Sequence, residues 1–563
     1  MLDFGKGGIL MSIGSFVLVL HSHLPYCRKA GVWPFGEEWV FEAMAETYIP
    51  LLDIVDYLVD RNALGSFTVG FTPVLLDQLS DPYMLLRFDE YLEAKIAAAE
   101  TDIARFGSES EWKLQELARF YRDRYEGVRS SYHRRHNGNL VDAFRALQDN
   151  GVIEILAGAA THAYLPLLAT DSSVYSQLKL GHDVYSQNFG RPPSGIWLPE
   201  CGYSPPSESS GVDRTLKDLG YSCFFVDAHA IEGGASIDVY SDRVLQKPQA
   251  RATAAKRDYT TYLPYLVSGS DTAVLGRNQR TALQVWSSEW GYPGDGNYRE
   301  FHRRDPISGF SYWKVTSRLV DISAKETYHP EAALMRAKEH ADHFVEMVER
   351  LLLDFNGETG KQGVIVAPFD VELFGHWWME GLDWLRWTLE GLSKSPHVEV
   401  LSASKFLEKH PPNEKIDLLE SSWGLGGGHY IWDNDLTNWM WQEIHNTEKE
   451  MQDITLKIIN KERQQKDDAS LRVRLLKQAA REALLLQSSD WPFLVTTEQA
   501  RDYGERRFLE HKHRFERLAH ALAQDVISPD TVSYLEQIES IDAVFPQIDF
   551  ATFMGKQGFC GKC

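Results

Sequence analysis

Cysteine is scarce in this sequence. The 563 residues include five cysteines, Cys27, Cys201, Cys223, Cys560 and Cys563, which are too few and too scattered to form a disulfide framework. The class of small secreted proteins that depend on disulfides is thereby excluded. We expect a reducing, cytoplasmic compartment.

Basic residues are outnumbered, and long apolar runs are absent. Lys and Arg total 58 against 80 Asp and Glu, which gives a net charge of −22. Because so acidic a surface repels phosphate groups, we expect neither nucleic acid nor an anionic membrane as a partner. The one targeting-like segment, residues 9–20, is cut short by a polar His-Ser-His, whereas a membrane span needs about 20 apolar residues. A buried strand explains this segment better.

Signatures of nucleotide chemistry are also missing. No Walker-type loop, Gly-x-Ser-x-Gly elbow or dinucleotide fingerprint occurs in suitable surroundings, so phosphoryl and hydride transfer are poor candidates. Tryptophan, by contrast, is plentiful, and most of the 16 tryptophans stand beside Gly, Asp, Glu or His. Such positions suit a neutral ligand with apolar faces and hydroxyl rims, such as sugar, although large proteins also bury tryptophans in their cores.

Short β-rich runs alternate with helical stretches from the N-terminus to about residue 405. Most of these runs are continuously apolar, which predicts strands buried on both faces of a parallel α/β barrel or open sheet. Polar clusters follow several runs, and ligands of parallel sheets bind at the carboxyl ends of the strands. The runs are residues 16–20, 66–69, 152–156, 195–198, 223–226, 283–286, 364–366 and 398–401.

Two segments depart from this alternation. Residues 81–150 carry apolar residues three and four apart, which predicts a helical insertion, and helical spacing returns beyond residue 406. We therefore expect an α/β barrel (1–80 and 151–405), a helical insertion (81–150) and a C-terminal helical domain (406–563). Residues 232–278 are too long and too rich in Gly, Ser and Ala for an ordinary connector, and we interpret them as a mobile loop over a site.

Two carboxylates stand out because each follows a strand and a proline. Glu200 closes the run Gly195-Ile-Trp-Leu-Pro-Glu200, and Asp370 closes Val364-Ile-Val-Ala-Pro-Phe-Asp370. In an aromatic-lined cleft two such carboxyls experience different environments, so one can stay ionised while the other keeps its proton, as glycosidic bond cleavage requires. Either one alone could be a structural cap at a strand end, but two in matching contexts favour chemistry.

Histidines support a rival hypothesis. His21 and His23 lie at a strand end, and imidazole and carboxylate are suitable ligands for a divalent metal. The tight His-x3-His or Glu-x-x-His spacing of a helical metal site is missing, so we favour hydrogen bonds from the histidines to sugar hydroxyls and predict no metal. The further ligands that a metal would use are His162, Asp227, His229 and Asp370.

Several long motifs occur in order along the chain. They are His21-Ser-His-Leu-Pro25, Gly31-Val-Trp-Pro-Phe-Gly-Glu-Glu-Trp39, Trp197-Leu-Pro-Glu-Cys-Gly-Tyr203, Val285-Trp-Ser-Ser288 with Gly291-Tyr-Pro-Gly-Asp295, Ala367-Pro-Phe-Asp-Val-Glu-Leu-Phe-Gly-His-Trp-Trp378 and Ser488-Ser-Asp-Trp-Pro-Phe493. Together they resemble glycoside hydrolase family 57 and, within it, the 1,4-α-glucan branching enzymes. The resemblance spans nearly the whole chain.

The resemblance implies a fold and a mechanism. The fold is α/β, a distorted (β/α)7 barrel with a helical insertion and a C-terminal all-α domain that contributes to the glucan site. The mechanism is a retaining double displacement without metal or other cofactor, in which Glu200 resembles the nucleophile and Asp370 the general acid/base. The residues that surround or bind glucan in the family carry over to His21, His23, Trp33, His162, Arg277, Trp286, Gly294, Trp423, Trp432, Asp490 and Gln499.

Asp490 and Gln499 are placed by the Ser488 to Phe493 motif and by a Gln nine residues after its Asp. The family's catalytic-loop tyrosine is not assigned, since four tyrosines compete in residues 232–278: Tyr240, Tyr259, Tyr262 and Tyr265.

The resemblance leads us to expect a branching enzyme. Its partner is an α-1,4-glucan such as amylose, glycogen or a starch-like polymer, whose α-1,4 bond is cleaved and whose chain is transferred to a 6-hydroxyl. The alternatives are an α-amylase or 4-α-glucanotransferase of the same family, a metal-dependent polysaccharide deacetylase that uses His21, His23 and an aspartate, and a non-catalytic glucan-binding protein. The sequence leaves the oligomeric state open.

Overall fold

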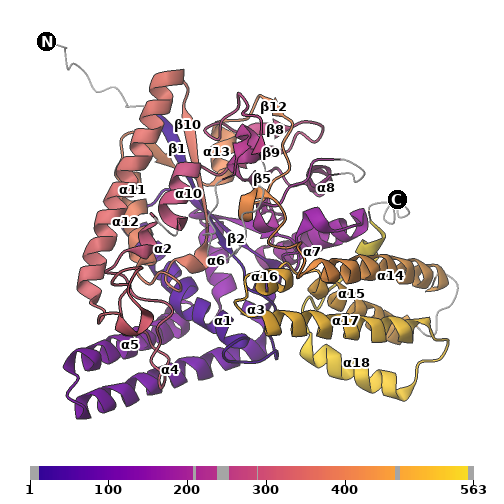
Figure 1. Cartoon of the computed structure of the whole chain (residues 1–563). Helices are drawn as coiled ribbons and strands as arrows, with labels where there is room; N and C mark the ends of the chain where they lie inside the picture. Colours follow the sequence, from indigo (N-terminus) through magenta and orange to yellow (C-terminus); the bar gives the residue numbers. More distant parts are fainter. Residues whose placement is uncertain (1–11, 207–210, 237–252, 288–289, 463–468, 556–563) are drawn as a thin grey trace.

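A computed structural model describes residues 12–206, 211–236, 253–287, 290–462 and 469–555, and a parallel barrel lies at its centre (Figure 1). Seven parallel strands follow one another in the order β10-β1-β2-β3-β4-β5-β9. A parallel bridge between Arg277 and Val366 brings the last strand back to the first, which closes the barrel and confirms the predicted fold class. The strands are β1 (Gly14–Ser22), β2 (Phe67–Phe71), β3 (Ile153–Gly158), β4 (Gly195–Trp197), β5 (Cys223–Val226), β9 (Ala273–Gly276) and β10 (Gly363–Asp370).

Among the described residues, five short strands lie outside the barrel. β11 (Val398–Val400) runs parallel to the start of β1. β8 (Tyr265–Val267) runs antiparallel to β9, and β12 (Lys415–Ile416) runs parallel to β8. β6 (Gly234–Ala235) and β7 (Thr253–Ala254) form a separate antiparallel pair.

Seven of the eight predicted strands are present. The runs at 16–20, 66–69, 152–156, 195–198, 223–226, 364–366 and 398–401 fall on β1, β2, β3, β4, β5, β10 and β11. β1 to β5 are buried along their whole length, which explains why these runs are continuously apolar.

The strand predicted at 283–286 is wrong. These residues lie in α10 (Gln279–Trp286), whose N-cap Asn278 accepts a hydrogen bond from the Thr281 backbone N–H at 3.0 Å. Ala282 and Val285, three residues apart, form its buried face. The missing barrel strand is β9, which lies inside the segment that we interpreted as a mobile loop. Residues 237–252 of that segment lie outside the described residues.

Helices surround the barrel, and a long helical excursion separates β2 from β3. Asp81 caps the first turn of α4 through the Met84 backbone N–H, and Pro82 occupies its first position, so the excursion begins at a well-defined residue. Phe88, Leu92 and Ala99 form the buried stripe of α4, as the spacing predicts. The excursion comprises α3 (Pro73–Ser80), α4 (Pro82–Ser108), α5 (Trp112–Ser130) and α6 (Leu140–Asp149).

The remaining helices before residue 410 follow the barrel strands or lead into them. In Figure 1, α11 and α12 lie together beside β10 and β1. These helices are α1 (Glu37–Ala43), α2 (Ile49–Asp60), α7 (Asp171–Phe189), α8 (Val212–Asp218), α9 (Ala228–Glu232), α11 (Pro330–Thr359), α12 (Gly381–Lys394) and α13 (Ala403–Lys409).

The helices α14 to α18 gather at one side of the barrel in Figure 1. They are joined to the barrel by an irregular segment that contains Trp423 and Trp432. Leu475, Ala479 and Ala483 on α15 are fully buried, as their four-residue spacing predicts. The helices are α14 (Asn438–Glu462), α15 (Ala469–Leu486), α16 (Asp490–Thr496), α17 (Arg501–Ala523) and α18 (Pro529–Ile541).

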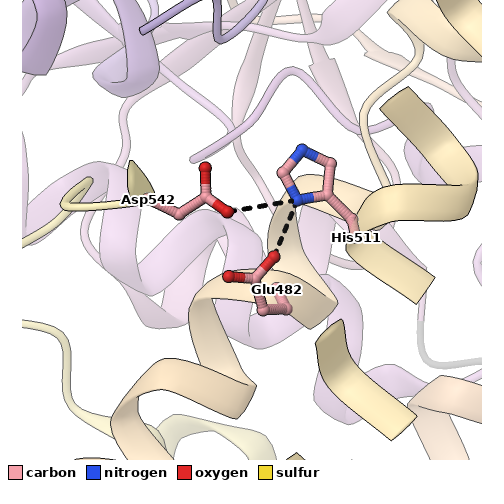
Figure 2. A group of neighbouring side chains, drawn as sticks. All are labelled: Glu482, His511 and Asp542. Atoms are coloured by element: carbon pink, nitrogen blue, oxygen red, sulfur yellow. Dashed lines mark hydrogen bonds and ion pairs between the residues drawn. The ribbon is translucent and has the colours of Figure 1, made fainter. Parts of the chain in front are cut away.

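A buried polar cluster connects three of these helices (Figure 2). His511 on α17 bonds through Nδ1 to Glu482 on α15 at 2.7 Å, and the same atom lies 3.9 Å from Asp542 at the end of α18. Arg507 donates to His511 Nε2 at 2.9 Å, so Nδ1 carries the ring proton and donates it to Glu482. Burial lowers the pKa of His511 and raises that of Glu482, so the imidazole is neutral.

Replacement of the buried imidazole should destabilise the C-terminal helices. We expect His511→Leu to lower the free energy of unfolding by about 3 kcal/mol, because a charged arginine and a buried carboxyl both lose a hydrogen-bond partner. The midpoint of urea unfolding measures the change. His513→Leu, at an exposed position of the same helix, is the control, and equal midpoints for both variants would contradict the prediction.

Candidate active site

The carboxyl ends of β1, β4 and β10 meet at one end of the barrel. His21 on β1 is the register partner of Asp370 on β10, and Glu200 follows β4 directly in the short helix η4 (Pro199–Cys201). Burial raises the pKa of Glu200, and the negative charge of Asp370 raises it further, so the two carboxyls interact within one site. The predicted residues that the structure brings together there are His21, His23, His162, Glu200, Arg277, Asp370, Trp423 and Asp490.

The backbone around Glu200 is held in an unusual conformation. Glu200 and Cys201 have φ values of 60° and 50°, and His162 has a φ of 55°. Such left-handed conformations are costly for residues other than glycine and persist only where the surroundings enforce them. Three of them at one site indicate that the position of the Glu200 carboxyl is enforced by its neighbours.

Trp423 holds Glu200 at two points. Its indole N–H donates a hydrogen bond to Glu200 Oε2, and its backbone N–H donates to the Glu200 carbonyl at 3.0 Å. An antiparallel bridge between Tyr203 and Ser421 aligns the two segments. The irregular segment after the barrel therefore fixes the orientation of this carboxyl.

Three histidines stack beside Glu200. The His23 and His162 rings have centroids 3.8 Å apart, and the Nε2 atoms of His21 and His162 lie 3.1 Å from each other. His162 Nδ1 lies 3.8 Å from Glu200 Oε1 and 2.9 Å from Ser489 Oγ. Burial and the neighbouring histidine charges lower the pKa values of His21 and His162, so both rings are neutral.

The C-terminal helices supply partners for two of these rings. Asp490, the first residue of α16, accepts from His23 Nε2 through Oδ1 at 3.0 Å and Oδ2 at 3.2 Å. Ser489 bonds to His162 through its hydroxyl and also donates its backbone N–H to the His162 carbonyl at 3.2 Å. The sequence analysis assigned Asp490 to the glucan, whereas in the structure its carboxylate pairs with His23.

Arg277 brings a buried positive charge to the site. Its side chain is 3% exposed and pairs with Asp227 at 2.6 Å, and the guanidinium lies 5.6 Å from the centre of the Trp423 ring. Its charge lowers the pKa of Asp370, although burial and Glu372 raise that pKa more strongly. Arg277 thus offsets part of the negative charge in the site.

Both candidate catalytic carboxyls are reluctant to ionise. Burial is the main cause, and it raises the pKa of Glu200 to about 8 and that of Asp370 to about 8. The Trp423 hydrogen bond and the His23 charge act in the opposite direction on Glu200. The two groups therefore titrate as a pair that retains a proton at neutral pH.

Other predicted glucan contacts lie outside this cluster. Trp33 is 74% exposed, and Gln499 is exposed in the turn between α16 and α17. Trp286 ends α10 and faces Trp377, with ring centroids 6.3 Å apart. Gly294 lines a different cavity, of about 490 Å³, together with Trp290, Arg318 and residues of α11.

Trp432 is not available to a glucan in this structure. Its side chain is 0% exposed and stacks on Tyr164 with ring centroids 4.1 Å apart, in a core cluster shared with Trp491. The predicted contact is therefore corrected, because a side chain without exposed surface is a packing residue. The sequence motif gave no signal of this burial.

The described loop tyrosines are engaged in the fold. Tyr262 stacks on Phe355 with ring centroids 4.8 Å apart, while the Tyr265 hydroxyl donates to the Thr260 carbonyl at 3.1 Å and its ring packs edge-on against Tyr259. Tyr240 lies outside the described residues. The family's catalytic-loop tyrosine therefore stays unassigned.

The site histidines do not converge as metal ligands do. His23 Nδ1 bonds to Thr72 at 3.0 Å, and its Nε2 is occupied by Asp490. Within the described ranges, the one group of three metal-ligating side chains whose ligand atoms all lie close together is the His511 cluster, where Arg514 pairs with Asp542 and Arg507 bonds to His511. The donor arrangement thus favours hydrogen bonding at the site.

Glu372 and Tyr48 were missed by the sequence analysis. Glu372 follows Asp370 by two residues and accepts a hydrogen bond from Tyr48, which lies 324 positions away in the chain. The only available signal was the second acidic residue in the Asp370-Val-Glu372 motif. Nothing in the sequence around Tyr48 marks it as a neighbour of the site.

Two regions of the chain match described protein families. Residues 17–418 match the family described as Glycosyl hydrolase family 57. The chain belongs to glycosyl hydrolase family 57. Residues 443–553 match a second description, "1,4-alpha-glucan branching enzyme, C-terminal".

Named relatives in this family span nearly the whole chain. A 1,4-alpha-glucan branching enzyme from Thermococcus kodakarensis is 42% identical over 94% of this chain and 77% of its own, and its crystal structure covers 97% of both chains with a TM-score of 0.87. The structure of a branching enzyme from Pyrococcus horikoshii has a TM-score of 0.84 and 40% sequence identity, with 97% of both chains covered. The structure of the alpha-amylase AmyC from Thermotoga maritima has a TM-score of 0.81 and 30% sequence identity, with 97% of this chain and 99% of its own covered.

Among the described residues, no helix is long and apolar enough to cross a bilayer.

The buried ion pair of the site should be important for stability. We expect Asp227→Ala to lower the free energy of unfolding by about 3–5 kcal/mol, because it leaves the Arg277 guanidinium buried without its partner. Thermal unfolding followed by circular dichroism measures this. The control is Asp342→Ala, which breaks an exposed pair with Lys338 and should leave the midpoint nearly unchanged. Similar midpoints for the two variants would refute the prediction.

Proposed function

We propose that this protein is a 1,4-α-glucan branching enzyme that works by retaining double displacement. Two half-buried carboxyls, Glu200 and Asp370, lie at the ends of separate barrel strands among aromatic and imidazole side chains, as such a mechanism requires. The match of residues 443–553 to the C-terminal region of branching enzymes carries the choice of chain transfer over hydrolysis.

In the first step Glu200 acts as the nucleophile. Its carboxylate attacks the anomeric carbon of an α-1,4-linked glucose, the bond to the leaving oxygen breaks, and Asp370 gives its proton to that oxygen. The product is a covalent glucosyl-enzyme. In the second step Asp370 takes the proton from the 6-hydroxyl of an acceptor chain, whose oxygen displaces Glu200 and forms an α-1,6 branch.

The neighbouring side chains orient this pair of carboxyls and bind the sugar beside it. Trp423 orients Glu200, and the proposed contacts of His21, His23, His162 and Arg277 are with sugar hydroxyls next to the reacting carbon. Asp490 acts on the site through His23. The exposed Trp33, with Trp286, Gly294 and Gln499, are proposed as contacts for the outer parts of the polymer.

The substrate that we propose is an α-1,4-glucan such as amylose, glycogen or a starch-like polymer. We place the reaction in the cytoplasm and in glycogen synthesis, and the three free cysteines among the described residues support a reducing compartment. An α-amylase of the same family is the second candidate, favoured by the structural likeness to AmyC. It would use the same two carboxyls with water as the acceptor.

Incubation with linear amylose distinguishes the two functions. We expect α-1,6 linkages, counted after treatment with a debranching enzyme, to exceed new reducing ends, because a branching enzyme transfers the cleaved chain to a hydroxyl. Reducing ends without α-1,6 linkages would identify a hydrolase and overturn the proposal.

Glu200→Gln is the matched variant for the same assay. The amide keeps the shape of the side chain but cannot act as a nucleophile, so both products should disappear while thermal unfolding stays that of a folded protein. Appreciable branching by Glu200→Gln would refute the assignment of the nucleophile.

The Trp423 hydrogen bond should set the acidic limb of the pH profile. The bond lowers the pKa of Glu200, so its loss in Trp423→Phe raises that pKa, and a higher pH is then needed to ionise the nucleophile. A hydrogen bond to a charged group contributes about 1.5 kcal/mol or more, so we expect the acidic limb of kcat/KM to move up by about one pH unit.

Trp432→Phe is the control for this measurement, since Trp432 is buried in the neighbouring core and makes no hydrogen bond to Glu200. Its acidic limb should match that of the unaltered enzyme. Coincident limbs for Trp423→Phe and the unaltered enzyme would show that the indole N–H does not tune the nucleophile.

A further inference from the structure

Glu372 is a buried carboxyl beside the half-buried pair proposed for catalysis. It lies in the short helix η7 (Val371–Leu373), directly after β10, and its side chain is 2% exposed. Its own carbonyl accepts the Trp377 backbone N–H at 3.1 Å, which fixes the turn that contains it. No role has been given to this residue in the steps above.

The Glu372 carboxyl is anchored by two donors from other parts of the barrel. The hydroxyl of Tyr48, at the end of the π-helix η1 (Met44–Tyr48), donates to Oε1, and the His23 backbone N–H donates to the same atom at 3.2 Å. A backbone N–H cannot move away without disturbing β1. The carboxyl is therefore held in place, two residues from Asp370.

Burial raises the pKa values of both carboxyls, and their charges interact. Burial raises the pKa of Glu372 to about 7, and the Tyr48 hydrogen bond restrains that rise. The pKa of Asp370 is raised to about 8, first by burial and then by the negative charge of Glu372. The negative charge of ionised Glu372 opposes the ionisation of Asp370.

The charged and titratable groups that face this pair come from four other elements. Arg277, which follows β9, is the cation that lowers the pKa of Asp370. His21 and His23 lie on or just after β1, Tyr48 ends η1, and Glu200 follows β4. His21 is neutral, and the Tyr48 pKa is raised by burial and by Glu372, so Tyr48 keeps its proton and remains a donor.

We propose that Glu372 is a positioning residue for the general acid: its anchored negative charge keeps the Asp370 carboxyl protonated at the pH at which it must protonate the leaving oxygen. The inference rests on the proposed role of Asp370. Glu372 itself touches neither the sugar nor the reacting atoms. It acts through Asp370, and it gives the acid/base residue an environment different from that of Glu200, which accepts the Trp423 indole hydrogen bond.

Glu372→Gln tests the inference because the amide oxygen can still accept both hydrogen bonds while the charge is lost. Without that charge the pKa of Asp370 falls, so the acid loses its proton at a lower pH. We expect the alkaline limb of kcat/KM on amylose to move down by about one pH unit. Above the limb this corresponds to about a tenfold loss of activity, with the acidic limb and the unfolding midpoint nearly unchanged.

Glu380→Gln is a matched control. Glu380 is also buried, and it also accepts one tyrosine hydroxyl, from Tyr328 at 2.6 Å, and one backbone N–H, from Arg299 at 3.1 Å. Glu380 is not among the groups whose charge shifts the pKa of Asp370. Its alkaline limb should therefore coincide with that of the unaltered enzyme.

Tyr48→Phe gives a second test should Glu372→Gln fail to fold. Loss of the hydroxyl raises the pKa of Glu372, so less of it is ionised at the alkaline limb, which should move in the same direction by a smaller amount. A limb that stays in place in every folded variant, or a uniform loss of activity across the pH range, overturns the inference.

Asp370→Asn separates this inference from the proposed function. If Asp370→Asn is inactive and the limb does not move in Glu372→Gln, the mechanism stands and the role of Glu372 is refuted. If Asp370→Asn keeps full activity, the proposed mechanism itself fails.

Discussion

Two carboxyl groups share one buried site, and the cost of charging both limits what the surrounding residues can be. Removal from water raises the pKa values of Glu200 and Asp370 alike. The neighbours then make the two groups different. Glu200 receives the Trp423 indole and the nearby His23 charge, which favour its ionised form, whereas Asp370 has Glu372 beside it, which favours its protonated form. A nucleophile and a proton donor built from two similar acids need unequal surroundings of this kind.

The residues that make this difference come from both ends of the chain. His23 lies just after the first strand of the barrel, but its Nε2 partner, Asp490, lies 467 positions later on α16. Ser489 approaches His162 in the same way, and Trp423 reaches Glu200 from the segment that joins barrel and helices. The C-terminal helices are thus part of the site, which agrees with the match of this region to branching enzymes.

Much of the barrel could be predicted from the sequence because strands covered on both faces are continuously apolar. The same pattern placed Glu200, Asp370 and His21 together, since the carboxyl ends of parallel strands meet at one edge. β9 was not predicted because it has only four residues in a stretch rich in Gly, Ser and Thr. The strand prediction at 283–286 was wrong because its apolar residues also suit the buried face of a short helix. Partners hundreds of positions apart, such as Tyr48 and Glu372, leave no local pattern. Burial of Trp432 depends on packing that its motif does not encode.

Arg277 performs two tasks with different parts of the same residue. Its backbone pairs with Val366 where β9 meets β10, and its side chain delivers the cation that faces Asp227 and Asp370. One residue thus closes the last seam of the barrel, between β9 and β10, and also places a positive charge near Asp370. A chain in which that seam is still open therefore also lacks the counter-charge of Arg277 beside Asp370.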